Sequence, residues 1–219
     1  MSEIETLLNE FEGIPEQIDR LRVDLINRLG NLYLEDPKDF EKRFYRLLKV
    51  EEKILAYGTA YGIKLEDYLY EICKRVLPEE TYKVERQKKL KKLSGEKIAD
   101  IVISTKISSE SAQVVLEVKS FIDRVTSPQS IEHLEQEKKD IEKDSNRKYL
   151  VFASSNYGNP SFESWKQHKD WIFLRCRREN TKDIKYKPIW DVVDGYYPFK
   201  NLIQAIKKAF RDGKEQGLS

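Results

Sequence analysis

The sequence predicts an α/β fold: a mixed β-sheet with helices on both faces, preceded by a helical region. Three observations lead to this class. Apolar residues recur every three or four positions through the first 57 residues, which is typical of amphipathic helices. Three strand-like segments then follow one another through short connections, and two later ones are each reached through a helical segment. Strands joined by turns pair antiparallel and strands joined through helices pair parallel, so together they make a mixed sheet.

The composition bounds the class of protein. At 219 residues the chain can bury a core of its own and is expected to form one domain, or one domain with an elaboration. Its 40 basic and 38 acidic residues nearly cancel, so only the local distribution of charge can indicate a partner. Cys73 and Cys176 lack CxxC spacing, which argues against a zinc site or a disulfide framework and favours a cytoplasmic setting. No segment approaches the roughly 20 apolar residues of a membrane-spanning helix, so we expect a soluble protein with no membrane partner.

Residues 1–57 are expected to form a helical subdomain. The sequence LEDPKD divides two apolar repeats, and there Asp36 can cap a helix that Pro37 begins. Nine basic and thirteen acidic residues make this region, taken whole, a poor nucleic-acid surface. We expect it to cover the sheet or a second subunit. The repeats contain Leu7, Leu8, Phe11, Ile18, Leu21, Leu25, Leu29 and Leu32, then Phe40, Phe44, Leu47, Leu48, Ile54 and Leu55.

Residues 58–212 are expected to form the main domain, and residues 213–219 a frayed tail. After Gly58 a loop leads into a helix that Pro78 ends. The next elements in order are strands at 81–90, 98–104 and 113–120, a helix at 131–143, a strand at 148–155, a short helix at 161–169, a strand at 171–177 and a helix at 199–211.

Two of these strands carry charged residues in an apolar setting. Asp100 stands between Ala99 and Ile101 in IADIVIS, and burial of a carboxylate is costly unless it has a partner. In VVLEVKS, Glu117 and Lys119 are two positions apart and therefore point to the same side of the strand. Carboxylates that converge from two neighbouring strands suit a hard divalent cation such as Mg²⁺. A lysine beside them can orient or deprotonate water and can stabilise the charge on a phosphate.

These charges also have a simpler interpretation. The pattern Glu-x-Lys occurs again at residues 51–53 and 137–139, on helices that look solvated, so the motif alone carries little information. On edge strands, Asp100, Glu117 and Lys119 would form a surface ladder of cross-strand ion pairs. The apolar residues around them favour the metal site, because an exposed face would show more polar alternation.

GEKIADIVIS followed by VVLEVKS resembles the core of the PD-(D/E)XK phosphodiesterase superfamily, the restriction-endonuclease-like fold. The resemblance covers about residues 58–178 and implies an αβββαβ core. It further implies that Asp100 and Glu117 are metal ligands and that Lys119 is the catalytic lysine. One position departs from the family pattern, since the proline that gives the family its name is Ala99 here.

The same resemblance implies two further site residues. Many members carry a metal-binding glutamate on the helix before the hairpin, for which Glu66 is the first candidate and Glu71 the second. An acidic residue near a helix N-terminus is favoured by the helix dipole in any case, which is the alternative for Glu66. Members often have a glutamine on the helix after the third strand, and Gln129 or Gln136 could serve, although ordinary surface glutamines are the simpler interpretation.

A basic segment leads directly into Asp100. Between Lys83 and Lys97 there are seven basic and two acidic residues, a local net charge of +5. Phosphate contacts supply most non-specific affinity for nucleic acid, so this hairpin is a candidate DNA-binding element. A lysine-rich edge that prevents association between sheets is an equal alternative. The candidate DNA contacts are Arg86, Lys88, Lys89, Lys91 and Lys92, with a smaller cluster at Arg175, Arg177 and Arg178.

These features and the resemblance together predict a Mg²⁺-dependent nuclease that hydrolyses phosphodiester bonds in DNA, with Mn²⁺ as a substitute metal. We expect an endonuclease of the restriction or defence kind that acts as a homodimer, the helical subdomain serving for dimerisation or DNA grip. A repair or recombination enzyme, such as a resolvase or an exonuclease, is one alternative. A non-catalytic nucleic-acid-binding or interaction module on the same fold is the other.

Overall fold

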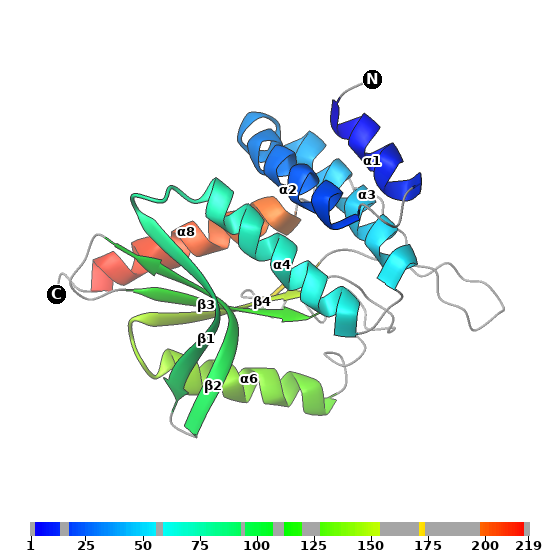
Figure 1. Cartoon of the computed structure of the whole chain (residues 1–219). Helices are drawn as coiled ribbons and strands as arrows, with labels where there is room; N and C mark the ends of the chain where they lie inside the picture. The colour runs from blue at the N-terminus through cyan, green and yellow to red at the C-terminus, as the bar shows by residue number, and fades with distance from the viewer. Residues whose placement is uncertain are drawn as a thin grey trace.

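The computed structural model describes residues 3–13, 18–55, 59–92, 95–106, 112–119, 128–153, 171–173 and 198–216. The helices are α1 (Glu3–Gly13), α2 (Ile18–Glu35), α3 (Pro37–Leu55), α4 (Thr59–Val76), α6 (Pro128–Glu142) and α8 (Pro198–Gln216). The strands are β1 (Tyr82–Lys92), β2 (Gly95–Thr105), β3 (Gln113–Lys119), β4 (Arg147–Ala153) and β5 (Trp171–Phe173). Figure 1 shows the sheet between two sets of helices, so the predicted α/β class is confirmed.

The strands form one open sheet in the order β1-β2-β3-β4-β5. β2 pairs antiparallel with β1 and with β3, whereas β4 pairs parallel with β3 and with β5. The sheet is therefore mixed, as predicted, because α6 carries the chain back between β3 and β4. The rest of the strand predicted at 171–177, the helix predicted at 161–169 and the arginine cluster at 175–178 lie outside the described residues.

Each face of the sheet has its own hydrophobic cluster. The larger one contains residues of the four helices α1, α2, α3 and α4 and of α8. They pack against strand residues such as Ile103, Leu116 and Phe152. The smaller one lies beneath α6 and includes Val102 and Val115. Figure 1 shows α6 on the opposite side of the sheet from α4. Strands covered on both faces read as continuous apolar runs, which accounts for the sequences of β2, β3 and β4.

The N-terminal helices pack against the rest of the chain rather than around a core of their own. Their apolar stripes join α4 and α8 in the larger cluster. The predicted start of α3 at Pro37 is confirmed, and Asp36 Oδ1 accepts the backbone N–H groups of Lys38 (3.0 Å) and Asp39 (3.1 Å) as an N-cap. None of the helices in the described ranges is long and apolar enough to cross a membrane.

The helices α4, α6 and α8 differ from the predicted boundaries, and α6 begins at Pro128 instead of 131. α4 already begins at Thr59, where the sequence suggested a loop. α8 continues to Gln216, so residues 213–216 of the predicted frayed tail are helical. Lys, Glu and Gln have high helix propensity, and they carry the helix past Gly213 despite the cost of glycine in a helix.

A buried glutamate of α3 caps α8. Glu41 is completely buried, and its Oε1 accepts the backbone N–H of Lys200 in the first turn of α8 at 2.9 Å. Helix N-termini leave N–H groups without partners inside the helix, so this contact ties α8 to α3. Burial raises the pKa of Glu41 to about 7, although the N–H groups of Lys200 and Phe199 act to lower it.

Glu41→Gln should make the protein more stable above pH 7. A raised carboxyl pKa means that the folded state binds the proton more tightly than the unfolded state. The contribution of Glu41 to stability therefore declines as pH rises from about 4.5 to about 7, and glutamine removes that decline. We expect a gain of up to about 3 kcal/mol at pH 8 and little change at pH 4.5, measured by urea unfolding. Glu35→Gln, at an exposed position, is the control; equal pH dependence in Glu41→Gln and wild type would contradict the prediction.

Candidate active site

The pairing of β2 with its two neighbouring strands is interrupted at Asp100. Pairing between β2 and β3 runs from Ser104 to Ile101 and is not continued at Asp100. On the other side, the β1 ladder has partners at Ala99 and Ile101 but omits Asp100, which faces Gln87 in register. Gln87 has a φ of 51°, a left-handed conformation that is uncommon for a residue with a side chain.

At Asp100, the residues of β2 that point to the α6 side of the sheet change from one alternate set to the other. Ala99 belongs to the cluster under α6, whereas Ile101 belongs to the cluster on the α4 side. Residues two apart in a regular strand share a face, so β2 is strongly twisted about Asp100. The twist releases Asp100 from the ladder, and its Oδ2 accepts the backbone N–H of Val118 on β3 at 2.7 Å. The carboxyl of Asp100 is thus held at the place where β2 and β3 separate.

Glu117 lies at this separation between two lysines. It is only 5% exposed, and its Oε1 accepts a hydrogen bond from Lys119, two residues along β3. The same-face relation predicted for this pair is therefore confirmed. Glu117 Oε2 accepts a second hydrogen bond at 2.6 Å from Lys97, which comes from β2. The predicted trio of Asp100, Glu117 and Lys119 is brought together, with Lys97 as an additional member.

Helix α6 supplies a second carboxylate to Lys97. Glu137 Oε2 lies 2.6 Å from Lys97 Nζ and also accepts the hydroxyl of Tyr149 at 2.9 Å. Although burial alone would raise the pKa of Glu137, the hydrogen bond and charge of Lys97, together with the Tyr149 hydroxyl, lower it overall. Glu137 is thus held in its charged form on the α6 side of the cluster.

The pKa of Asp100 is shifted in the opposite direction, upward. Burial, followed by the nearby negative charge of Glu117, raises the pKa of Asp100 to about 7. The Val118 N–H and the charge of Lys119 oppose this rise, and the charge of Glu66 adds to it. A buried carboxyl group next to a second carboxylate is therefore driven to keep its proton.

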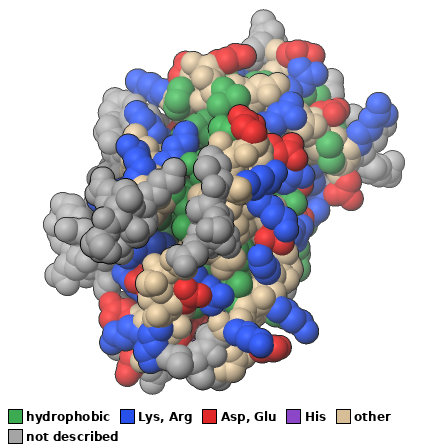
Figure 2. All heavy atoms as spheres, turned by 90° about the vertical axis from the view of Figure 1, so that its left-hand side faces the viewer, with side chains coloured by type: hydrophobic (Ala, Val, Ile, Leu, Met, Phe, Trp, Pro, Cys, Tyr) green, Lys and Arg blue, Asp and Glu red, His purple; other side chains and the backbone are tan. Residues whose placement is uncertain are grey.

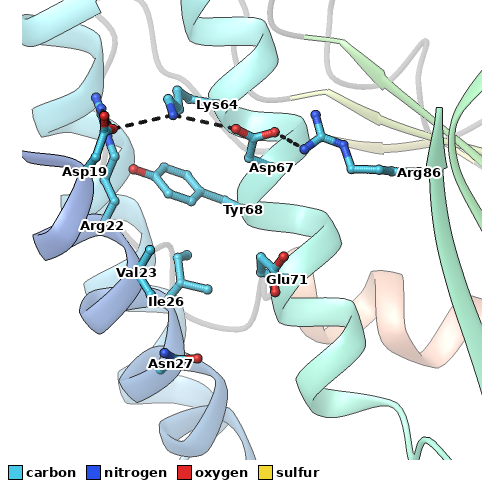
Figure 3. A pocket seen from close by; sticks show the side chains of 10 residues that line it. All are labelled: Asp19, Arg22, Val23, Ile26, Asn27, Lys64, Asp67, Tyr68, Glu71 and Arg86. Carbon is cyan, nitrogen blue, oxygen red and sulfur yellow. Dashed lines mark hydrogen bonds and ion pairs between the residues drawn. The ribbon is translucent and has the colours of Figure 1, made fainter.

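Of the two candidate glutamates on α4, only Glu66 lies near this cluster. Glu66 is buried, accepts a hydrogen bond from Gln87 Nε2 at 2.6 Å and lies 3.6 Å from Arg86. Glu71 is exposed and lines a cavity of about 440 Å³ between α2 and α4 (Figure 3). The second candidate, Glu71, is therefore not placed at the site, because five positions along a helix turn the side chain to another side.

The candidate glutamines are not brought to the cluster. Gln136 is exposed and donates to Asp140 on the outer surface of α6 at 3.0 Å. The side chain of Gln129 lies outside the described residues. The inward position on α6 belongs instead to Glu137, the neighbour of Gln136.

The basic residues of β1 divide into two groups. Arg86 points to α4, where its guanidinium lies 2.5 Å from Asp67 at the edge of the cavity (Figure 3), and Lys88 lies 2.6 Å from Glu85. Lys89 and Lys91 are exposed, and the side chain of Lys92 is not among those described. On the face seen in Figure 2, Lys and Arg side chains are spread widely with acidic ones among them. β1 is also an edge strand, so its exposed lysines suit DNA contact and edge protection equally.

Sequence reasoning missed Lys97, Glu137 and Tyr149 as site residues. In the sequence, Lys97 is only one of the basic residues of the hairpin. It is, however, two positions before Ala99, which is buried. Glu137 falls at helical spacing between Leu134 and Ile141, two residues of α6 that are buried in the smaller hydrophobic cluster. The position of Glu137 among these apolar residues could have identified it from the sequence, because a charge on the apolar side of a helix needs a buried partner.

Two carboxylates of this cluster, those of Asp100 and Glu117, could together bind a divalent cation. Asp100 and Glu117 come from neighbouring strands, and a bound cation would favour the charged form of Asp100 against the burial and the Glu117 charge that raise its pKa. Within the ranges that the structure describes, no three or more His, Cys, Asp or Glu side chains form a group that could hold a metal, so Glu66 does not complete such a group. Mg²⁺ keeps several waters and is often bound by only one or two carboxylates. Comparisons with protein families, curated proteins and solved structures give no match to this chain.

Proposed function

We propose that this protein is a divalent-cation-dependent nuclease that hydrolyses phosphodiester bonds in DNA. The observation that carries the proposal is the convergence of Asp100 and Glu117 where β2 and β3 separate, with Lys119 on Glu117. The order α4, β1, β2, β3, α6, β4 supports it further, since it is the αβββαβ order of the restriction-endonuclease-like core. An endonuclease of the restriction or defence kind, acting as a homodimer, is the form that we propose.

Each residue of the cluster has a role in this reaction. Asp100 and Glu117 would hold Mg²⁺ or Mn²⁺, with Glu66 adding negative charge nearby. The bound cation would supply Lewis-acid stabilisation of the charge that develops on the phosphate. Lys119, whose side chain is 37% exposed, would orient the attacking water and stabilise the phosphate oxygens. Water then adds to phosphorus as the bond to the leaving oxygen breaks, and that oxygen takes up a proton.

The test is a cleavage assay with the purified full chain. Supercoiled plasmid, linear duplex, branched and single-stranded DNA are each incubated with Mg²⁺, with Mn²⁺ or with a chelator. We expect product only with a divalent cation, and a nicked or linearised plasmid would identify an endonuclease. If none of the substrates is cut with either metal, the nuclease proposal fails.

A non-catalytic DNA-binding module is the second candidate, and one observation favours it. Both oxygens of Glu117 accept hydrogen bonds from lysines, so the protein itself already balances the charge that a metal would neutralise. This alternative predicts salt-sensitive DNA binding that does not depend on divalent cations and does not lead to cleavage.

The exposed lysines of β1 allow a direct test of DNA contact. We expect Lys89→Gln with Lys91→Gln to weaken DNA binding uniformly across sequences. The slope of log K against log salt should fall by about 1 for each phosphate that is no longer neutralised, measured by fluorescence anisotropy from about 50 to about 200 mM salt. Lys42→Gln with Lys49→Gln, exposed on α3 in the acidic region, is the matched control. Unchanged DNA binding with greater aggregation would instead support the edge-protection role.

A further inference from the structure

The two lysines on Glu117 differ in how firmly they are held. The Lys97 side chain is 9% exposed, and its ammonium group lies 2.6 Å from a carboxylate oxygen of Glu117 and 2.6 Å from one of Glu137. The same group lies 5.3 Å from the ring centroid of Tyr149. Lys97 is therefore fixed by residues from β3, α6 and β4.

Among the residues that the structure describes, Lys119 is held by fewer partners than Lys97. Its side chain is 37% exposed, and its ammonium group contacts Glu117 on the same strand. A lysine side chain has many rotamers, and an exposed one can leave its partner at little cost. Releasing Lys97 would instead leave two buried carboxylates without it, which is far more costly.

We propose that Lys97 is a positioning residue, which together with Glu137 and Tyr149 holds the carboxylate of Glu117 beside Asp100. With one oxygen of Glu117 fixed by Lys97, Lys119 is free to act on substrate. The consequence for catalysis rests on the proposed function, whereas the contact itself does not. Glu137 sets the position of Lys97, and the Tyr149 hydroxyl sets that of Glu137.

This role differs from that of an ordinary structural ion pair. A structural pair, when it is broken, would lower the free energy of unfolding without weakening cation binding. A positioning residue must also change the environment of Glu117 and the affinity of the site for a cation. Removing a positive charge next to a cation site would, on charge alone, strengthen cation binding. Weaker binding after the removal of Lys97 is therefore the result that positioning predicts and charge does not.

The experiment compares Lys97→Met, Lys97→Arg and the control Lys139→Met, a substitution at an exposed position on α6. Full-length protein is labelled with ¹³C at glutamate carboxyls, and the signal of Glu117 is assigned by its disappearance in Glu117→Gln. We expect the Glu117 signal to move in Lys97→Met without any metal, to be largely restored in Lys97→Arg and to be unchanged in Lys139→Met. In a calorimetric titration with Mg²⁺, Lys97→Met should bind about 10- to 100-fold more weakly than wild type.

Two results would overturn the proposal: an unchanged Glu117 signal in folded Lys97→Met, or Mg²⁺ binding at least as tight as that of wild type. If Lys97→Met does not fold, Tyr149→Phe removes only the hydroxyl that positions Glu137 and should move the Glu117 signal in the same direction by less. A wild-type protein that binds no Mg²⁺ would defeat the proposed nuclease function. The Glu117 signal would still decide whether Lys97 positions this carboxylate.

Discussion

Glu117→Gln should lower the rate of cation-dependent DNA cleavage by about 10³-fold or more. Glutamine keeps the shape of the side chain but has no charge to hold a divalent cation next to Asp100. Removal of a charge that stabilises the transition state costs several kcal/mol, and each 1.36 kcal/mol corresponds to about a tenfold change in rate. The measurement is a single-turnover plasmid cleavage assay over a range of Mg²⁺ concentrations.

Controls for this substitution must separate catalysis from folding. Glu117 is buried between Lys97 and Lys119, so its neutralisation removes a partner from both lysines and should also lower the free energy of unfolding. Lys119→Met is the matched variant, because this partly exposed lysine can be removed with little loss of stability and yet should abolish cleavage. Glu132→Gln, at an exposed position on α6, should leave cleavage intact. Cleavage by Glu117→Gln at the wild-type rate would exclude this carboxylate from the reaction.

The three charged residues Asp100, Glu117 and Lys119 could be predicted, because their placement follows from local pattern. An acid inside IADIVIS and the period of two in VVLEVKS place Asp100, Glu117 and Lys119 on neighbouring strands without knowledge of the packing. Glu66 could be named only through the family resemblance. Its proximity to Asp100 depends on how α4 crosses the sheet, which no local pattern specifies.

The contacts to α6 could not be predicted in the same way. Whether Gln136 or Glu137 faces the sheet depends on the rotation of α6 by about 100° per residue, which is set by packing against β3 and β4. Leu134 and Ile141 indicate that rotation, but the partner of Glu137 lies 40 residues away on a different element. Lys97 illustrates the same limit, since the sequence around it is basic and only the twist at Asp100 turns it inward.

The N-terminal helices show this limit for charged residues inside a core. Their apolar stripes and the start of α3 follow from spacing and capping, and the structure has both. The pairing of Arg22 with Glu51 across 29 residues does not follow from either. In the sequence both residues resemble ordinary charges of solvated helices, although Glu51 is completely buried.

Arg22→Met should lower the free energy of unfolding by about 3–5 kcal/mol, because it leaves the carboxylate of Glu51 buried without its cation. The guanidinium of Arg22 binds both oxygens of Glu51 at 2.6 Å, and the hydroxyl of Tyr68 on α4 also donates to Glu51. These contacts join α2, α3 and α4. Urea unfolding provides the measurement, and Arg20→Met at an exposed position on α2 should change stability by less than about 0.5 kcal/mol. A decrease below about 1 kcal/mol in Arg22→Met would contradict the prediction.

The double variant Arg22→Met with Glu51→Leu tests why the single change is costly. If the cost comes from the unpaired charge of Glu51, replacing both groups by apolar ones should recover most of the lost stability. The Tyr68 hydroxyl would then lack its acceptor, so recovery should remain incomplete by about 1–3 kcal/mol. Tyr68 follows Glu66 by two residues on α4, which connects this anchor to the candidate active site. A double variant that is stable but cleaves DNA more slowly would show that the polar anchor contributes to placing α4, in addition to holding the helices together.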